Sequence, residues 1–172
     1  MLFRSLATQH LIELGHRDIA FICGDPDHPD ANERLQGYRV ALQTAGIAFS
    51  ADLVVPGGYL EANGLQAVDR LLSTRQRFSA IFAANDQMAL GAMLGLHRHG
   101  LRVPDNISLV GFDDLPTSMY ATPPLTTVDQ PAFELGQLAA SAILSLLVGK
   151  KPIIEVPAPR LIARESSRRL RL

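Results

Sequence analysis

Apolar segments of two kinds alternate along this chain, and their spacing separates strands from helices. Short apolar runs such as 107–111 lack internal polar positions, which is typical of strands buried on both faces. Longer segments repeat apolar positions every three or four residues, as at Leu65, Val68 and Leu71. The alternation predicts an α/β fold, a doubly wound parallel sheet with helices on both faces.

The predicted elements follow one another in strand and helix order. An amphipathic N-terminal helix ends at Gly15, because glycine favours helix termination. The strands are expected at 18–23, 53–55, 78–83 and 107–111. Helices are expected at 32–45, through 65–72 and at 85–98. No internal repeat or linker divides this part of the chain.

The pattern changes after Gln130. Pro131 can occupy the first turn of a helix, and the apolar positions that follow form a wide hydrophobic face. Two strand-like pieces are expected at 153–156 and 161–163, before an arginine-rich tail that a solvated chain end would explain. So wide an apolar face requires a partner, so we expect the helix to pack back or to exchange with a second chain.

The helix predicted at 85–98 carries apolar residues on more than one face. A surface helix usually has one apolar stripe, which covers its own sheet. A second apolar face suits contact with another copy of the chain. We therefore expect Leu90 and Leu94 to lie in a dimer interface.

Composition excludes several classes of function. The chain has 172 residues and 47% hydrophobic content, enough for one sizeable core. Its net charge is -1, so the chain lacks the strong positive field expected of a surface that binds nucleic acid. Cys23, the only cysteine, excludes an internal disulfide and reads as a buried thiol rather than a nucleophile. No apolar run is long enough for a membrane span, so we expect a cytoplasmic protein without a membrane partner.

The motifs of common catalytic and metal sites are absent. We find no GxSxG elbow, GxxxxGK[ST] loop, HExxH or CxxC pair, and expect neither an enzyme nor a cofactor. Prolines interrupt the acidic segment 25–30, so it does not match a calcium loop. His97 and His99 are two positions apart and would point away from each other on a helix.

Polar side chains follow the predicted strands where ligands bind in open α/β sheets. Asn85 could bind a sugar hydroxyl or cap the helix that it precedes. Asp113 could accept two hydroxyl hydrogen bonds or satisfy the backbone of its own turn. Arg34 could donate to ligand oxygens or form an ordinary helix salt bridge, and Tyr59 could stack on a ring or pack against the next helix. Gln130 and Asp30 are weaker candidates.

Six segments in order resemble the effector-binding part of the lac repressor and galactose repressor family of bacterial transcription regulators. They are HLIELGHRDIAFICG, ERLQGYRVAL, FAANDQMALGAM, GLRVPDNISLVGFDD, PPLTTVDQP with the preceding Tyr120, and LIARESS. The resemblance spans nearly the whole chain. It implies a fold like the periplasmic sugar-binding proteins, in which two lobes close on a small effector and alter DNA affinity, and it implies homodimerisation.

The resemblance also assigns roles by position. Arg34 matches the arginine that holds effector oxygens, and Asp113 matches the acidic residue of the GFDD turn. Asn85 matches a pocket asparagine of sugar-responsive members, Tyr59 an aromatic residue that stacks on the effector, and Gln130 a residue near the lobe crossover. Two further positions, where the family varies its effector contacts, are His28 and Asp30.

The chain departs from the family pattern at its beginning, where members carry a helix-turn-helix and most of a first lobe. We therefore expect a truncated regulator that reaches operator DNA only through a domain absent here, with half a pocket. Residues 1–130 would form the C-terminal lobe, 131–157 a crossover helix and strand of the first lobe, and 158–172 a return strand and tail. The alternative is a fragment of a periplasmic-type sugar-binding protein.

Overall fold

A parallel β-sheet forms the centre of the molecule, which a computed structural model describes over residues 2–170. The strand order is β2-β1-β3-β4, and neighbouring strands run parallel. These strands are β1 (Ile19–Cys23), β2 (Val54–Pro56), β3 (Ala80–Ala83) and β4 (Ser108–Val110). The central strand β3 is buried throughout, as its uninterrupted apolar sequence predicts.

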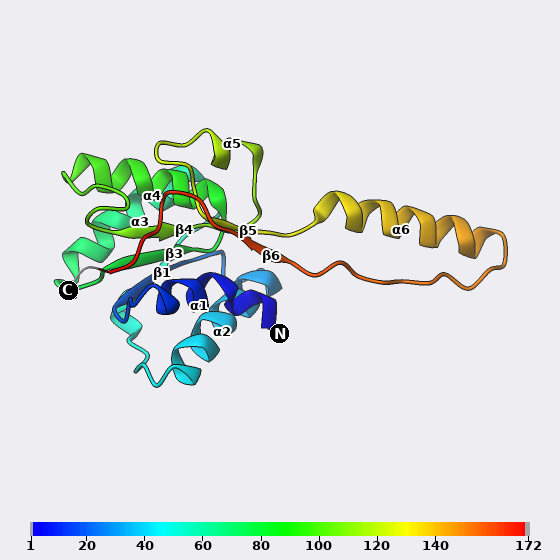
Figure 1. Cartoon of the computed structure of the whole chain (residues 1–172), viewed down its shortest axis with the longest axis horizontal. Helices are drawn as coiled ribbons and strands as arrows, with labels where there is room; N and C mark the ends of the chain where they lie inside the picture. Colours follow the sequence, from blue (N-terminus) through cyan, green and yellow to red (C-terminus); the bar gives the residue numbers. More distant parts are fainter. Residues whose placement is uncertain (1, 171–172) are drawn as a thin grey trace.

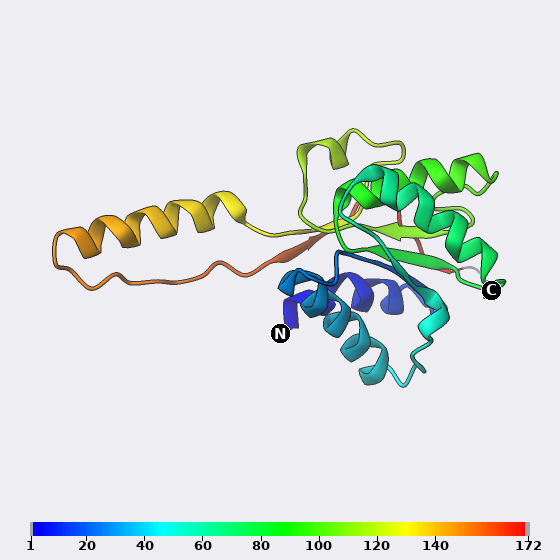
Figure 2. The same ribbon diagram turned by 180° about the vertical axis from the view of Figure 1, so that it is seen from behind.

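Helices cover both faces of this sheet. One face carries α1 (Leu6–Glu13) and α2 (Pro29–Thr44), with the 3-10 turn η1 (Leu2–Ser5) preceding α1. The other carries α3 (Glu61–Ser73) and α4 (Asp86–Arg98), as Figures 1 and 2 show from opposite sides. A second 3-10 turn, η2 (Ala51–Leu53), leads into β2. The fold is therefore the doubly wound α/β sheet that the sequence predicts.

Close packing between α3 and α4 depends on small residues. A Cβ atom at Gly64 would meet the backbone of Met88, and one at Gly91 would meet the backbone of Glu61. The two helices can approach this closely because neither glycine carries a side chain. On the opposite face of the sheet, the core includes the stacked rings of Phe21 and Tyr38, with centroids 5.2 Å apart.

The last strands extend the sheet beyond β4. β5 (Thr127–Asp129) lies beside β4 through parallel bridges from Val110 to Thr126 and from Asp113 to Asp129, and it pairs antiparallel with β6 (Arg160–Ile162). The short helix α5 (Pro116–Met119) lies between β4 and β5. After β6, buried Ser166 donates to the carbonyl of Leu109 (2.6 Å) and accepts from the amide of Thr126 (2.7 Å).

The C-terminal segment returns beneath the first helix. His10 Nε2 lies 2.9 Å from Ser167 Oγ, and His16 Nε2 lies 3.1 Å from the carbonyl oxygen of Arg168. These contacts join α1 and the residues that follow it to a segment more than 150 positions later. The predicted free tail is therefore wrong for 164–168, where this end of the chain forms part of the body.

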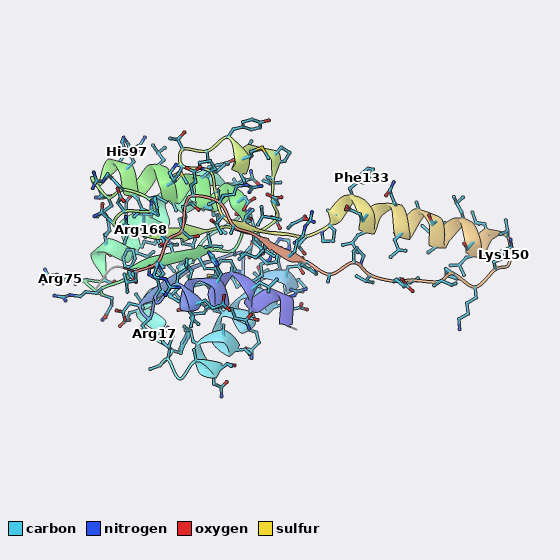
Figure 3. The ribbon with its side chains drawn as sticks, viewed as in Figure 1. Arg17, Arg75, His97, Phe133, Lys150 and Arg168 are labelled. Carbon is cyan, nitrogen blue, oxygen red and sulfur yellow. The ribbon has the colours of Figure 1, made fainter. Side chains whose placement is uncertain are left out.

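A hairpin of α6 (Ala132–Leu147) and the returning segment 148–159 projects from the body (Figure 1). Figure 3 places Phe133 at its near end and Lys150 at its tip. No residue of α6 is buried, so the prediction that this helix packs back is wrong for the single chain. The strand predicted at 153–156 is also absent, because no neighbouring strand supplies hydrogen-bond partners there.

Candidate functional site

Four of the predicted ligand-binding side chains meet at the carboxyl edge of the sheet. Arg34 comes from α2, Asn85 from the β3–α4 junction, Asp113 from the segment after β4, and Gln130 from the end of β5. Parallel strands bring these ends to one edge, although the residues span almost a hundred positions of sequence. Hydrogen bonds link three of them directly and the fourth through the backbone of its neighbour.

Arg34 is a buried cation that joins two strand ends. Its Nη1 donates to the carbonyl oxygen of Ala84 (2.8 Å), and its Nη2 lies 3.4 Å from Asp113 Oδ1. The guanidinium carbon also lies 4.3 Å from the centroid of the Phe112 ring, a cation–π contact. The salt bridge connects α2 to the segment after β4, rather than two turns of one helix.

Asp113 stands at the centre of the four side chains. Its Oδ1 accepts from Gln130 Nε2 (2.9 Å) as well as facing Arg34, so distant segments rather than its own turn engage it. Burial raises the pKa of Asp113, and the Arg34 guanidinium and the Gln130 hydrogen bond act against that rise. The backbone of Asp113 has φ 110°, a conformation that costs energy for a residue other than glycine.

Asn85 performs the capping role and also contacts the site. Its Oδ1 accepts from the amide of Met88 (2.9 Å), which caps α4. Its Nδ2 donates to the carbonyl oxygen of Tyr59 (2.9 Å). The second hydrogen of this amide bonds to no group within residues 2–170, so capping leaves it able to donate to a ligand.

Tyr59 lies beside the end of β1. A Cβ atom at Gly24 would collide with its ring, so the ring contacts the backbone there, and Tyr59 also packs against the hydrophobic core. The His28 ring meets it edge-on, with centroids 5.7 Å apart. The Tyr59 hydroxyl is enclosed and has no hydrogen-bond partner within residues 2–170. Burial raises its pKa, so the group is a neutral donor without an acceptor.

The two remaining candidates lie at the start of α2 and are exposed. His28 precedes the helix and contacts Tyr59 alone among the site residues. Asp30 faces Arg4 across 3.4 Å, and its side chain is 68% exposed. The structure therefore keeps His28 beside the site through one ring contact and turns Asp30 toward the N-terminal segment.

Two residues that sequence reasoning did not assign hold the site together. Asp86 is fully buried and accepts three hydrogen bonds from the segments after β4 and in β5. Arg164 donates to Asp114 Oδ1 (2.7 Å) and to the carbonyl of Leu125 (2.8 Å). Their positions after a strand and in the LIARESS segment were visible in the sequence. Their partners were not, because they are far away along the chain.

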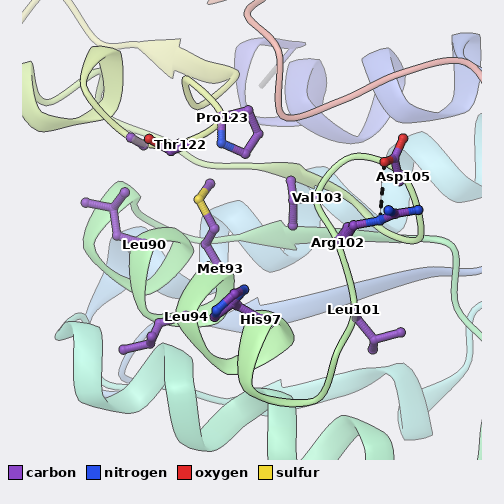
Figure 4. A pocket seen from close by; sticks show the side chains of 11 residues that line it. Leu90, Met93, Leu94, His97, Leu101, Arg102, Val103, Asp105, Thr122 and Pro123 are labelled. Atoms are coloured by element: carbon purple, nitrogen blue, oxygen red, sulfur yellow. Dashed lines mark ion pairs between the residues drawn. The ribbon is translucent and has the colours of Figure 1, made fainter.

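Leu90 and Leu94 lie on a separate surface. They line a groove of about 510 Å³ between α4 and the segment before β5 (Figure 4). Its other lining residues are Met93, His97, Leu101, Arg102, Val103, Asp105, Ala121, Thr122 and Pro123. None of the candidate ligand-binding residues lines it, so the groove and the carboxyl-edge site are distinct.

The site offers no recognisable metal centre. Within residues 2–170, no group of three or more His, Cys, Asp or Glu side chains is arranged to hold a metal ion. The Cys23 thiol donates to the carbonyl of Val55 (3.1 Å), and burial raises its pKa, which disfavours the reactive thiolate. The edge is equipped to bind polar groups through hydrogen bonds.

An open parallel sheet with convergent polar loops at its carboxyl edge defines a ligand-binding lobe of the α/β class. The model of the periplasmic binding protein-like domain family matches residues 8–167. The chain belongs to this family, and the curated proteins that it resembles are transcription regulators of the lac repressor type. The predicted resemblance is therefore confirmed.

The relatives are regulators rather than enzymes. The transcriptional repressor PurR of Proteus mirabilis (strain HI4320) is 41% identical over 94% of this chain and 48% of that protein. The regulator GalR of Escherichia coli (strain K12) is 42% identical over the same shares. The chain thus spans about half the length of the curated relatives it matches.

Solved structures agree over nearly the whole chain. The Escherichia coli transcriptional repressor AscG superimposes with a TM-score of 0.92 at 37% identity, over 96% of this chain and 61% of that one. A complex of the regulator CelR with cellobiose gives a TM-score of 0.89 at 39% identity, over 96% and 51%. No helix within residues 2–170 is long and apolar enough to cross a bilayer.

Proposed function

We propose that the chain forms the effector-binding and dimerising portion of a bacterial regulator of the lac repressor type. The observation that carries this proposal is the convergence of Arg34, Asn85, Asp113 and Gln130 at one edge of the sheet. Structural stability alone does not require a buried arginine and a partly buried aspartate to meet beside an open edge. The relatives are regulators, which disfavours the alternative of a periplasmic carrier fragment.

The donors and acceptors at this edge suit a small polyhydroxylated effector, a sugar or a nucleoside-like molecule. Asp113 uses Oδ1 for its protein partners, which leaves Oδ2 to accept ligand hydroxyls. Arg34 and Asn85 retain unused N–H groups, and the Tyr59 hydroxyl lacks an acceptor. The Tyr59 ring supplies an apolar face beside these polar groups, the usual combination in sugar sites.

The Asp113 side chain at the effector site is 29% exposed, and we propose that the site is one jaw of a two-lobe clamp. In this division residues 1–130 form the C-terminal lobe, 131–157 are a crossover helix and strand that belong with a first lobe, and 158–172 are a return strand and basic tail. The exposed apolar face of α6 supports the division, because such a face requires a covering surface. A first lobe or the exchanged segment of a second copy would supply it.

The roles of DNA and of cellular location are proposed from the relatives, which are transcription regulators. We propose that operator DNA is contacted by a separate domain, because a net charge of -1 gives this chain no phosphate-binding field. A cytoplasmic location fits such a regulator, and the proposed partners are the effector and a second copy of the chain, with no membrane.

A thermal-shift screen of sugars and nucleosides tests the proposal. The chain is compared alone and joined to the first half of Escherichia coli GalR. A ligand should stabilise the joined form, and Asp113→Asn should remove that shift while Asp69→Asn, on the far surface, leaves it unchanged. Equal stabilisation of the Asp113→Asn variant would contradict the assigned site.

A further inference from the structure

The carboxylate of Asp86 joins three separate parts of the chain from a fully buried position at the first turn of α4. Its Oδ2 accepts hydrogen bonds from the Leu115 amide (2.8 Å) and from Ser118 Oγ (2.6 Å). Its Oδ1 accepts one from Thr127 Oγ1 (2.6 Å), and its backbone N–H donates to the Phe112 carbonyl (2.8 Å). Both oxygens are therefore engaged.

Each of these connections adjoins a residue of the proposed effector edge. Asn85 immediately precedes Asp86, and Asp113 immediately follows Phe112, whose carbonyl accepts from the Asp86 amide. Gln130 lies three positions after Thr127. The surroundings leave this carboxylate little freedom, since a Cβ atom at Gly111 would collide with it. A displacement of the carboxylate would therefore move all three junctions together.

The same carboxylate also holds the segment that borders the Leu90 and Leu94 groove. Ser118, whose hydroxyl donates to Asp86, accepts a backbone hydrogen bond from Leu125 (2.8 Å), which closes the loop between them. Residues 121–123 of that loop line the groove opposite α4 (Figure 4). One loop thus belongs to the groove and is tied to the effector edge.

We propose that Asp86 is a positioning residue that couples occupation of the groove by a second copy of the chain to the arrangement of the effector edge. Packing against residues 121–123 shifts the loop, and the hydrogen bond from Ser118 transmits the shift to the Asp86 carboxylate. Thr127 and Leu115 then carry it toward Gln130 and Asp113. The assignment of an effector to this edge rests on the proposed function, whereas the coupling between the two places does not.

The test uses the side-chain amide signals of Gln130 and Asn85 in ¹⁵N NMR spectra of the unliganded chain. Ser118→Ala removes one bond to Asp86 at the groove end and should shift both signals. In an Asp86→Ala background the same change should leave them unmoved, because no side-chain oxygen remains at position 86 to accept from Ser118. Gln87→Ala is the matched control, since Gln87 follows Asp86 but bonds Glu61 at the surface.

Sedimentation supplies a second readout. Ser118→Ala should weaken self-association about fivefold, the lower range of typical coupling, and less in the Asp86→Ala background. A purely structural role would lower stability equally in both backgrounds without this difference. If Asp86→Ala does not fold, Thr127→Val replaces it with the Gln130 signal as the readout, because that change removes the link toward Gln130.

Unmoved Gln130 and Asn85 signals in the Ser118→Ala variant would overturn the proposal. Equal shifts in both backgrounds would overturn it as well, since the signal would then bypass Asp86. If the signals are coupled but no sugar or nucleoside stabilises the joined form, the proposed function fails and the positioning role of Asp86 remains.

Discussion

At the scale of single residues, two opposing effects act on the Asp113 carboxylate, namely its burial and the nearby Arg34 cation. Burial raises the pKa of Asp113, and the nearby Arg34 guanidinium lowers it. The Asp113 side chain remains 29% exposed, enough for one oxygen to face a ligand. Replacing the Arg34 cation should therefore change the pKa of Asp113 while the chain remains folded.

Arg34→Met should raise the pKa of Asp113 further, because burial then acts with less opposition. It should also lower the free energy of unfolding by about 2 kcal/mol, since the Ala84 carbonyl loses a charged donor. Carboxylate NMR titration and chemical denaturation measure the two effects. Arg39→Met, a change on the exposed part of α2, is the control, and an unchanged Asp113 pKa in Arg34→Met would refute the balance.

Sequence reasoning recovered some residue roles and missed others for a physical reason. Asn85 and Asp113 follow strands directly, so the rule for the carboxyl edge of a sheet identified them. Asp86 stood in the same position, but its partners lie some thirty to forty residues later. Hydrogen bonds of this kind leave no local pattern, so its role as a junction became visible only in three dimensions.

At the scale of elements, short apolar runs and helical spacing placed β1 to β4 and α1 to α4 correctly, whereas β5 and α5 were not predicted. The strand predicted at 153–156 did not form, because β-sequence becomes a strand only where a neighbouring strand pairs with it. The terminal segment was predicted as a free tail, yet residues 166–168 bond to β4 and to the α1 region. Local sequence carries no record of such distant partners.

The terminal segment 166–168 contacts His16, so the stability gained from its attachment to the body should depend on pH. The ring lies between Ser79 Oγ (2.8 Å) and Ser108 Oγ (3.0 Å), and burial lowers its pKa, as it does for His10. Between the lower folded pKa and the ordinary pKa of 6.5, His16 therefore binds a proton in the unfolded chain but not in the folded chain. Stability should be full above the ordinary value of 6.5 and fall as the pH drops through the lower folded pKa.

Denaturation midpoints between about pH 8 and pH 5 measure this dependence. His16→Gln cannot take up the proton, so the variant should be less stable at pH 8 but should lose less stability on acidification. The difference between the two chains isolates His16 from the buried carboxyl groups. Parallel pH profiles for both chains would show that His16 does not contribute.

The hairpin of α6 should behave as an independent appendage. No α6 residue is buried, so Ile143→Lys with Leu147→Lys should change the free energy of unfolding by less than about 0.5 kcal/mol. The same pair should reduce self-association if a second chain covers this face. A loss of stability well beyond that value would show that α6 packs on the body.

At the scale of the whole molecule, two separate surfaces are proposed to serve effector binding and self-association. The carboxyl edge of the sheet carries the proposed effector contacts, and the groove beside α4 is proposed to meet a second copy. Fold class and family could be predicted from the sequence. Hydrophobic patterning indicates the buried strands and helices of the body, and six ordered segments indicate the family. The relation between the two surfaces did not, since it depends on how loop 115–123 folds back.

Charge placed in the groove should disrupt association while sparing the fold. Leu90→Glu and Leu94→Glu should shift the mass measured by light scattering toward the monomer at unchanged helicity. Val40→Glu is a matched control, because Val40 is 40% exposed and Leu94 45%, on helices covering opposite faces of the sheet. An unchanged mass in both groove variants would place the interface elsewhere.

The most direct test of the account is to map, by NMR, which residues respond when sugars and nucleosides are added. The measurement uses the ¹⁵N-labelled chain alone and joined to the first half of Escherichia coli GalR. The account predicts that the largest shifts occur at Arg34, Asn85, Asp113, Gln130 and Tyr59, with smaller ones at Ser118, and that all are stronger in the joined form. Shifts confined to the groove of Leu90 and Leu94, or no response in either form, would contradict it.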